Sequence, residues 1–285
     1  MLTALNVLRL LRVKQWYKNA VIFIPLIFSF NLFDAELFIL TILGFIALCF
    51  VSSSGYILND LVDVEKDKHH PEKKNRVLAS GKVGKGSAVF ISIILLAASL
   101  LLSFYLSPLF LCFVLGLFAL SQTYNLLIRD LAFLDIALIS VNFVLRTVSG
   151  GYVIDEPISY WVVLCTFFIS FFLVSAKRSA DVSIKHSKDY RPAYNKEDKK
   201  VLEFASVLSA TCVFVFFSVY SILFKRPGLL LSLPVALYIT FQFLRSLYFD
   251  SEKVRNPENF VFDKKILISI LVWLILIVLG LYFFR

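Results

Sequence analysis

One stretch decides the fold, namely FILTILGFIALCFVSSSGYILNDLVDVEKD, residues 38–67. Its first part, 38–58, has no charged residue and matches the roughly 20 residues with which a helix crosses the hydrocarbon core of a bilayer. Only a helix satisfies its own backbone hydrogen bonds there. Its second part, 59–67, holds three aspartates, one glutamate and one asparagine. The stretch therefore predicts a membrane helix that ends in an acidic cluster.

Similar apolar runs recur along the whole chain. Of its 285 residues, 59% are hydrophobic and 17% charged, whereas a soluble domain is about 45–50% apolar. We therefore predict an all-α, polytopic membrane protein with about nine transmembrane helices. The predicted spans are 20–33, 38–58, 87–106, 108–127, 132–153, 158–176, 201–223, 228–248 and 265–284.

The net charge is +9, and the Lys and Arg residues are concentrated in alternate loops, as in a membrane protein. The charge therefore indicates no nucleic-acid partner. The N-terminus and the segments 59–86, 177–200 and 249–264 contain most of the Lys and Arg residues, while the intervening connections carry almost none. By the positive-inside rule, the N-terminus is expected in the cytoplasm and, after nine spans, the C-terminus outside. The expected location is the cell (cytoplasmic or inner) membrane.

Residues 1–285 are expected to form a single membrane-embedded domain. Its two long cytoplasmic loops each follow the second helix of a possible four-helix repeat. The repeats would cover about 12–130 and 131–250, with a ninth helix at 264–285. The alternative is that any chain with nine helices has two loops longer than the rest.

The acidic cluster has the spacing of one helix face. Asp60, Asp63 and Asp67 stand at i, i+3 and i+7, with Asn59 beside them, so they share a face if the helix continues past Leu58. Like charges so placed repel unless a cation lies between them. Oxygen ligands favour a hard ion, and Mg²⁺ commonly uses one or two carboxylates plus substrate phosphates. The cluster is therefore interpreted as a metal–diphosphate site.

Basic residues near this cluster could neutralise the same phosphates. Lys73 and Arg76 follow in the same loop, although such residues also set topology and contact lipid headgroups. Arg146 lies inside the fifth span, so it should face a polar interior or an anion.

Two further groups of charges are less specific. In the second loop, Lys177 and Arg178 precede Asp181 at helical spacing, which a local ion pair also explains. A short solvated loop accounts for most of the polar residues around the turn from the fourth to the fifth span, which are Asn125, Arg129, Asp130 and Asp135.

Taken together, these motifs resemble the UbiA-type intramembrane prenyltransferase superfamily, and within it the branch that contains decaprenyl-phosphate phosphoribosyltransferase. The first aspartate motif of the superfamily is matched by Asn59, Asp60, Asp63 and Asp67. The branch is matched by Leu11–Asn19, Asp67–Pro71, Ala79–Gly81, Leu145–Arg146 with Gly150–Gly151, and Ala176–Arg178. Val13 stands where the branch usually has Pro, and Asp181 where it has Glu.

The resemblance implies transfer of 5-phosphoribose from phosphoribosyl diphosphate to a polyprenyl (decaprenyl-type) phosphate in cell-envelope glycolipid synthesis, with Mg²⁺ as cofactor. It assigns the metal and the catalysis to Asp60, Asp63 and Asp67, with Asn59 as a further metal ligand. The implied substrate-binding residues are Lys14, Lys18, Asn59, Lys73, Arg76, Arg146, Lys177, Arg178 and Asp181. Two alternatives stay open: a prenyltransferase acting on an aromatic acceptor, which would use the same metal site, and a non-catalytic transporter of lipid or small anions.

Overall fold

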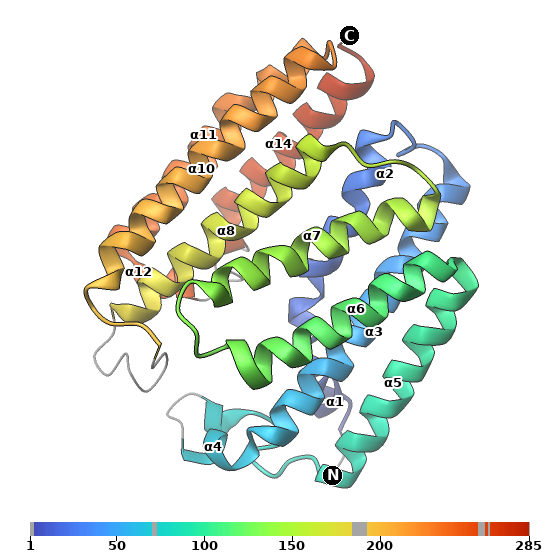
Figure 1. Ribbon diagram of the computed structural model, residues 1–285, viewed down its shortest axis with the longest axis vertical. Coiled ribbons are helices and arrows are strands. Elements are labelled where there is room, and N and C mark those ends of the chain that lie inside the picture. The colour runs from blue at the N-terminus through green and yellow to red at the C-terminus, as the bar shows by residue number, and fades with distance from the viewer. Residues whose placement is uncertain (1–2, 70–72, 184–192, 256–259, 262, 285) are drawn as a thin grey trace. The chain divides into compact units, whose positions relative to one another are not determined.

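The computed structural model describes residues 3–69, 73–183, 193–255, 260–261 and 263–284, and all regular structure in these ranges is helical (Figure 1). This confirms the predicted all-α class. In chain order the elements are α1 (Ala4–Leu10), η1 (Val13–Phe23), α2 (Ile24–Phe28), α3 (Ala35–Val62), α4 (Val64–His69), η2 (Lys73–Asn75), α5 (Lys85–Leu106), α6 (Pro108–Thr123), η3 (Tyr124–Ile128), α7 (Leu134–Ile154), α8 (Tyr160–Val182), α10 (Asp198–Leu223), η4 (Pro227–Ser232), α11 (Leu233–Phe249), α12 (Ser251–Arg255) and α14 (Lys264–Tyr282).

Within the described ranges, eight helical segments are long and apolar enough to cross a membrane. They are 35–62, 85–106, 108–128, 134–154, 160–182, 198–223, 227–249 and 264–282. Each overlaps one of the predicted spans from the second to the ninth. The chain is therefore a multi-pass membrane protein.

The predicted first span, 20–33, is not a continuous α-helix. Residues 13–23 form the 3₁₀-helix η1, and α2 adds only 24–28, with Pro25 in its first turn. Because proline has no backbone N–H, Pro25 cannot donate the hydrogen bond that would continue an α-helix from the end of η1. Since a 3₁₀-helix rises about 2.0 Å per residue, η1 and α2 together extend about 30 Å if straight. The segment is therefore long enough to cross the hydrocarbon core with fewer residues than an α-helix needs. The total of nine membrane crossings stays a prediction.

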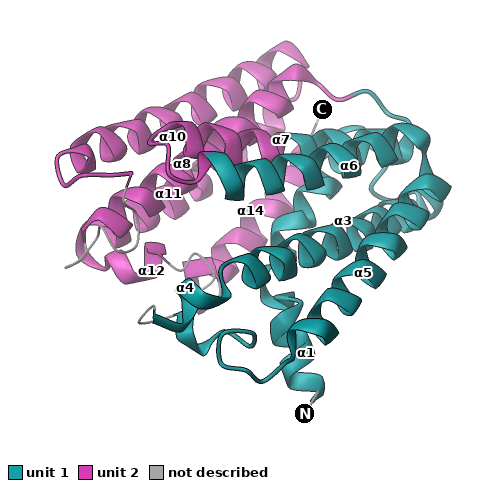
Figure 2. Ribbon diagram, turned by 60° about the horizontal axis from the view of Figure 1, so that its bottom comes forward, with its two compact units in different colours: residues 1–127, 145–157 teal, residues 128–144, 158–285 magenta. Residues whose placement is uncertain are grey.

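The chain divides into two compact units, 1–127 with 145–157, and 128–144 with 158–285 (Figure 2). The first half of α7 belongs to the second unit and its second half to the first. The break at 127/128 lies near the predicted repeat boundary at 130/131, but the exchanged segment 145–157 does not follow it. The single domain and the four-helix repeats remain predictions.

In the first unit, α3 and α5 lie side by side and are joined through small polar side chains. The Ser54 and Ser92 hydroxyls are 2.9 Å apart, and Ser99 donates to the Ala47 carbonyl at 2.8 Å. The outer face of α5 exposes large apolar side chains such as Phe90. Burying serines while exposing large apolar side chains is typical of helices that pack against one another inside lipid.

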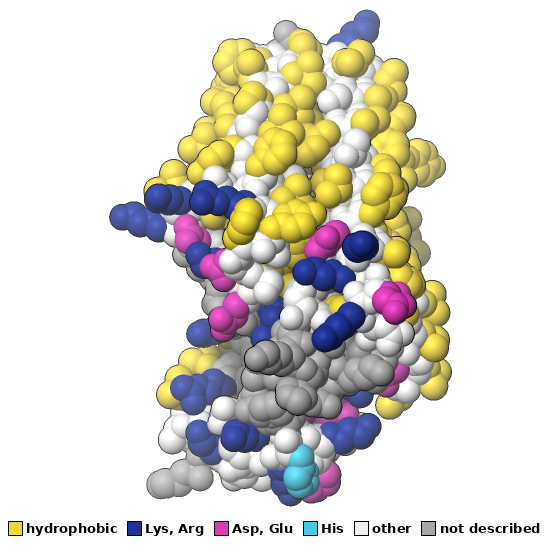
Figure 3. All heavy atoms as spheres, turned by 90° about the vertical axis from the view of Figure 1, so that its left-hand side faces the viewer, with side chains coloured by type: hydrophobic (Ala, Val, Ile, Leu, Met, Phe, Trp, Pro, Cys, Tyr) yellow, Lys and Arg dark blue, Asp and Glu magenta, His cyan; other side chains and the backbone are white. Residues whose placement is uncertain are grey.

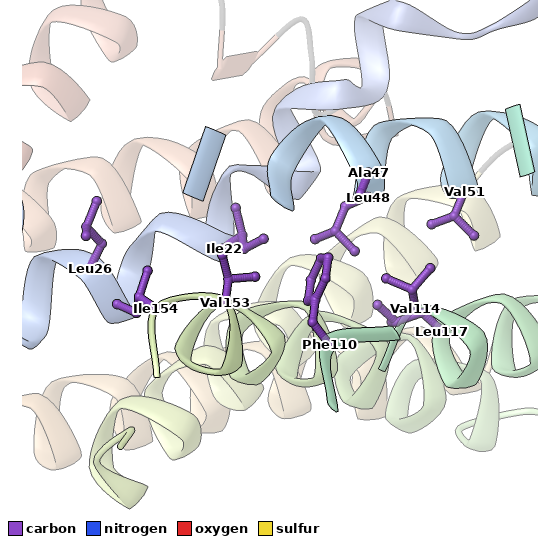
Figure 4. Close-up of a cluster of buried hydrophobic side chains, with 10 residues drawn as sticks. All are labelled: Ile22, Leu26, Ala47, Leu48, Val51, Phe110, Val114, Leu117, Val153 and Ile154. Carbon is purple, nitrogen blue, oxygen red and sulfur yellow. The ribbon is translucent and has the colours of Figure 1, made fainter. Parts of the chain in front are cut away.

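The apolar core of the first unit lies where η1, α2, α3, α6 and the second half of α7 meet (Figure 4). Phe110 projects from α6 toward α3, and its side chain is fully buried. Ile22 brings η1 into the same core, while Val153 contributes from α7. This core anchors η1 against α3, which positions the polar residues described below.

In the second unit, α8 packs along α10, again through a pair of serines. The Ser175 and Ser206 hydroxyls are 2.8 Å apart. Phe172 of α8 meets Phe243 of α11 with 5.0 Å between ring centroids, inside a buried apolar cluster. Figure 3 shows hydrophobic side chains along most of the length of α10 and α11, and charged side chains gathered toward the end at which α10 begins. That distribution suits a bundle with lipid along its length and water at its end.

Candidate functional site: a carboxylate pair and two arginine networks

The helix that carries the acidic cluster continues past Leu58, as the spacing requires. α3 ends at Val62, and Asp63 and Asp67 each donate a backbone N–H to the carbonyl four residues earlier, at 2.9 and 2.8 Å. The helical path therefore runs from α3 into α4. Asp60 and Asp67 are buried, at 6% and 3% exposure, while Asn59 and Asp63 are half-buried.

Two arginines neutralise the buried carboxylates. Nη1 of Arg76 donates to Asp60 at 3.0 Å and to Asp67 at 2.7 Å, so one nitrogen contacts both carboxylates. Arg12 donates through Nη2 to the same oxygen of Asp60 at 2.5 Å. Arg12 was not among the residues predicted for the site, although it lies in the quoted stretch Leu11–Asn19. The two aspartates thus converge on a single position suited to a cation.

A cavity of about 300 Å³ adjoins this position. Arg9, Arg12 and Arg76 line it together with Asp60 and Asn75. Three guanidinium groups around one space form an electropositive site, and guanidinium is well shaped to hold phosphate oxygens in pairs.

The donor set fits a divalent cation that also binds a phosphate ligand. Among the residues that the structure describes, no three His, Cys, Asp or Glu side chains lie close enough together to hold a metal ion by themselves. Among these residues the role of Asp63 as a third carboxylate ligand stays a prediction. Two carboxylates do converge, and Mg²⁺ commonly uses one or two together with substrate phosphates and water. Asp60 and Asp67 suit that arrangement, with Asn59 and Asp63 on the adjoining turn.

The 3₁₀ geometry of η1 arranges its side chains in rows, because residues three apart eclipse each other in this helix. Trp16, Asn19 and Ile22 form the row that faces α3: Trp16 Nε1 donates to the Ser53 hydroxyl at 3.0 Å, and Asn19 Nδ2 donates to Cys49 Sγ at 3.2 Å. Sequence periodicity did not reveal this row, since a short apolar run does not distinguish the two helix types.

Gln15 and Lys18 lie three residues apart in a second row of η1, and Arg12 is the residue that precedes this helix. Lys18 Nζ donates to the Gln15 side chain at 3.3 Å. The exposed Lys14 lies outside this row, and in the described part of the chain no hydrogen bond or ion pair joins it to the carboxylate pair.

Arg146 faces a polar interior, as its place inside a span predicted. Its side chain is 9% exposed and donates to the Asn19 Oδ1 at 2.8 Å. It also hydrogen-bonds Tyr56, a residue of α3 one turn before Asp60. Asn19 and Tyr56 are polar residues that sequence reasoning missed, because each stands alone in an apolar context.

The second unit contains a separate buried network around Arg178. Its Nε donates to Asp135 of α7 at 2.6 Å, and Asp135 also accepts from the Tyr194 hydroxyl at 2.5 Å. Tyr194 in turn accepts the Phe133 backbone N–H at 2.8 Å. Burial, with the hydrogen bond to Asp135, raises the pKa of Tyr194. Asp135 is fully buried, so the solvated loop that explains most of the neighbouring polar residues does not explain this one.

Asp181 belongs to the same network. It lies 3.4 Å from Arg178 and 3.5 Å from Arg255 of α12. The local Arg178–Asp181 pair was predicted, while the partners Asp135 and Arg255 were not. Lys177 is half-buried on α8, one residue before Arg178.

The predicted site residues thus fall into two groups. Asp60, Asp67 and Arg76 meet in the first unit, and Lys73 lies one helical turn before Arg76, to whose N–H its carbonyl bonds at 2.9 Å. Arg178 and Asp181 meet in the second unit. The structure describes the loop 182–200 only at residues 182–183 and from Ala193 onward.

The sequence matches the profile of one protein family. The profile of the UbiA prenyltransferase family matches residues 21–262. A decaprenyl-phosphate phosphoribosyltransferase of Corynebacterium glutamicum is 31% identical over 228 residues, which cover 75% of this chain and 67% of the relative. The protein of the same name from Mycolicibacterium smegmatis is 28% identical over 234 residues, covering 80% and 74%.

Solved structures share the fold. One of digeranylgeranylglyceryl phosphate synthase aligns with a TM-score of 0.65 at 18% identity, covering 97% of each chain. A UbiA homologue from Archaeoglobus fulgidus, bound to GPP and Mg²⁺, aligns with a TM-score of 0.58 at 16% identity, covering 96% of this chain and 98% of that one. With the family profile covering most of its length, the chain belongs to the UbiA prenyltransferase family and is a multi-pass membrane transferase.

Proposed function

We propose that this protein transfers 5-phosphoribose from phosphoribosyl diphosphate to a polyprenyl phosphate, with Mg²⁺, at the cytoplasmic face of the cell membrane. One observation carries the proposal: the carboxylates of Asp60 and Asp67 converge on one cation position beside a cavity lined by three arginines. The choice of a phosphoribosyl donor and a polyprenyl phosphate acceptor is supported by the two bacterial relatives, which are named decaprenyl-phosphate phosphoribosyltransferases.

The cation position would be held by Asp60 and Asp67, with Asn59 and Asp63 completing the set. Mg²⁺ held by these residues would supply positive charge that stabilises a diphosphate leaving group. Arg76 and Arg12 then have a second role, because guanidinium groups displaced from the carboxylates can turn to phosphate oxygens in the adjoining cavity. Further candidates for phosphate contact are Lys14, Lys18, Lys73, Arg146, Lys177 and Arg178, with Asp181 orienting the last two.

The reaction breaks the bond between ribose C1 and a diphosphate oxygen and forms a bond between C1 and an oxygen of the acceptor phosphate. Positive charge develops on the ribose carbon while negative charge gathers on the leaving group. Once the arginines contact the phosphate oxygens, their positive charge stabilises the negative charge that develops on the leaving group. The acceptor phosphate is already anionic at neutral pH, so the reaction requires no general base.

The donor can be tested with purified full-length protein in detergent, with Mg²⁺ present or chelated. One mixture holds labelled phosphoribosyl diphosphate and decaprenyl phosphate, and the other holds labelled prenyl diphosphate and an aromatic acid. We expect Mg²⁺-dependent label in a lipid phosphodiester from the first mixture only. Asp60→Asn should abolish this product, whereas Asp155→Asn, a change at an exposed residue of the same unit, should not.

The other outcomes separate the alternatives. Label in an aromatic product from the second mixture would replace the proposed donor with a prenyl diphosphate. No turnover in either mixture, with Asp60→Asn equal to wild type in ligand binding, would contradict both enzymatic functions and favour a transporter.

A further inference from the structure

Tyr56 occupies a distinctive place on α3, one turn before Asp60 and inside the apolar part of the helix. The guanidinium carbon of Arg12 lies 4.9 Å from the centre of its ring. The same Arg12 donates to Asp60. Arg12 therefore links the carboxylate pair to a second polar position that lies deeper in the span.

Three cationic side chains from three elements surround this second position. The charges of Lys18, Arg146 and Arg12 all act on the Tyr56 hydroxyl, and Arg146 also hydrogen-bonds it. Lys18 comes from η1, Arg146 from α7 and Arg12 from the turn before η1. Positive charge gathered within a membrane span is costly unless it meets an anion, so ionisable residues there commonly mark a ligand site.

The hydrogen bonds leave Tyr56 able to donate. Its oxygen accepts from Arg146, because a guanidinium group has only donors. The hydroxyl proton is then directed away from Arg146. Asn19 holds Arg146 from the other side through the 2.8 Å bond to its Oδ1, and Asn19 is itself 1% exposed and tied to Cys49. Asn19 thus fixes the position of the Arg146 guanidinium beside the Tyr56 hydroxyl.

We propose that Tyr56, Lys18 and Arg146 form the subsite for the phosphate of the lipid acceptor. This inference rests on the proposed function, and it deepens that function by separating acceptor from donor. The subsite lies on the apolar side of Asp60, within the stretch of α3 that is apolar enough to cross a membrane, which suits an anion that carries a hydrocarbon chain. The electropositive cavity lies next to Asp60, Asn75 and Arg76, in the polar loop. The phosphate next to Tyr56 therefore belongs to the lipid, and the diphosphate belongs to the carboxylate pair.

The separation between the two positions suits the reaction. Tyr56 and Asp60 are one helical turn apart, about 5–6 Å along the axis. In a displacement at C1, the attacking and leaving oxygens lie on opposite sides of the carbon, with reacting atoms about 3–3.5 Å apart before reaction. Arg12 contacts both positions, so it is placed to hold the two anions in register.

The test measures binding of farnesyl phosphate, a short lipid monophosphate, to full-length protein in detergent without Mg²⁺ or donor. Farnesol and inorganic phosphate are measured beside it to distinguish a lipid phosphate from a free one. The variants are Tyr56→Phe, which keeps the ring under Arg12, and Lys18→Gln. Their matched controls are Tyr105→Phe and Lys85→Gln, at exposed positions of α5 in the same unit.

We expect each site variant to weaken farnesyl phosphate binding about tenfold or more, the effect of losing one hydrogen bond to a charged group. The controls should bind like wild type, and farnesol and inorganic phosphate should bind more weakly than farnesyl phosphate. Equal binding of farnesol, or farnesyl phosphate binding that both variants leave unchanged, would overturn the inference. Inorganic phosphate binding as tightly as farnesyl phosphate would overturn the assignment to a lipid.

A second measurement separates this inference from the proposed function. Mg²⁺-dependent binding of phosphoribosyl diphosphate should be unaffected by Tyr56→Phe. If wild type transfers no phosphoribose but farnesyl phosphate binding still depends on Tyr56 and Lys18, the proposed function fails and the lipid-phosphate subsite stands. If transfer is normal while farnesyl phosphate binding ignores both residues, the subsite is wrong and the function stands.

Discussion

The network around Asp135 makes a sharp prediction for Tyr194→Phe. The substitution keeps the ring, which packs edge-on against Phe133 with 5.6 Å between centroids. It removes the hydroxyl that donates to Asp135 and accepts the Phe133 N–H. A hydrogen bond to a charged group contributes about 1.5–3 kcal/mol, and a buried N–H left without an acceptor costs about 1–3 kcal/mol. Since such contributions are not fully additive, the expected loss of stability is about 2–4 kcal/mol.

Thermal unfolding in detergent measures this loss. For a protein of this size, about 2–4 kcal/mol corresponds to a Tm lower by roughly 5–10 °C. The matched control is Tyr160→Phe, because Tyr160 belongs to the same unit and is 86% exposed. A Tm for Tyr194→Phe equal to that of the control would refute the role given to the hydroxyl.

The pH dependence gives a second check on the same residue. Burial and the bond to Asp135 raise the pKa of Tyr194 above its ordinary value of about 10, so folding favours the neutral hydroxyl. Its contribution is fully present below about pH 10 and is lost as the pH rises through the raised pKa. The Tm difference between wild type and Tyr194→Phe should therefore stay constant between about pH 6 and pH 9. A difference that shrinks within this range would contradict the assignment.

Two close helix approaches provide further predictions. A Cβ at Gly150 would clash with the Ile22 carbonyl of η1, so Gly150→Ala should destabilise the protein by about 1–3 kcal/mol. The control is Gly116→Ala, whose added methyl group meets open space. This control should be neutral or should stabilise the protein by up to about 1 kcal/mol. Equal Tm values for these two variants would show that η1 does not approach α7 so closely. In the second unit, a Cβ at Gly280 would lie 2.7 Å from the Gly228 carbonyl, and Gly280→Ala should likewise lower the Tm; an unchanged Tm would contradict the packing of η4 on α14.

Most of the fold could be predicted from composition and hydropathy, because a lipid solvent imposes long apolar helices. The eight spans from 35 to 282 follow the predicted ranges to within a few residues. The structure of residues 13–28 could not be predicted in this way. Apolar content does not reveal 3₁₀ hydrogen bonding, which makes η1 longer than an α-helix of the same number of residues. The exchange of 145–157 between the units depends on packing around Ile22 and Val153, which no local pattern contains.

The acidic part of the site could be predicted from the sequence, because helical spacing alone places Asp60 and Asp67 near one another. Their arginine partners could be predicted only in part. Arg76 follows in the same loop, whereas Arg12 is 48 residues from Asp60 and one of several N-terminal cations. Asp135 and Tyr194 are 59 residues apart, and each alone resembles an ordinary loop residue. Such partners become visible only when the fold brings them together.

The central claim is that Asp60 and Asp67 hold a divalent cation together with the donor diphosphate. The most direct test is calorimetric binding of phosphoribosyl diphosphate, with and without Mg²⁺, to wild type, Asp60→Asn, Asp67→Asn and the control Asp155→Asn. We predict that wild type and the control bind only with Mg²⁺, and that each site variant weakens this binding by about tenfold or more. Binding that is independent of Mg²⁺, or equal in wild type and both site variants, would contradict the claim.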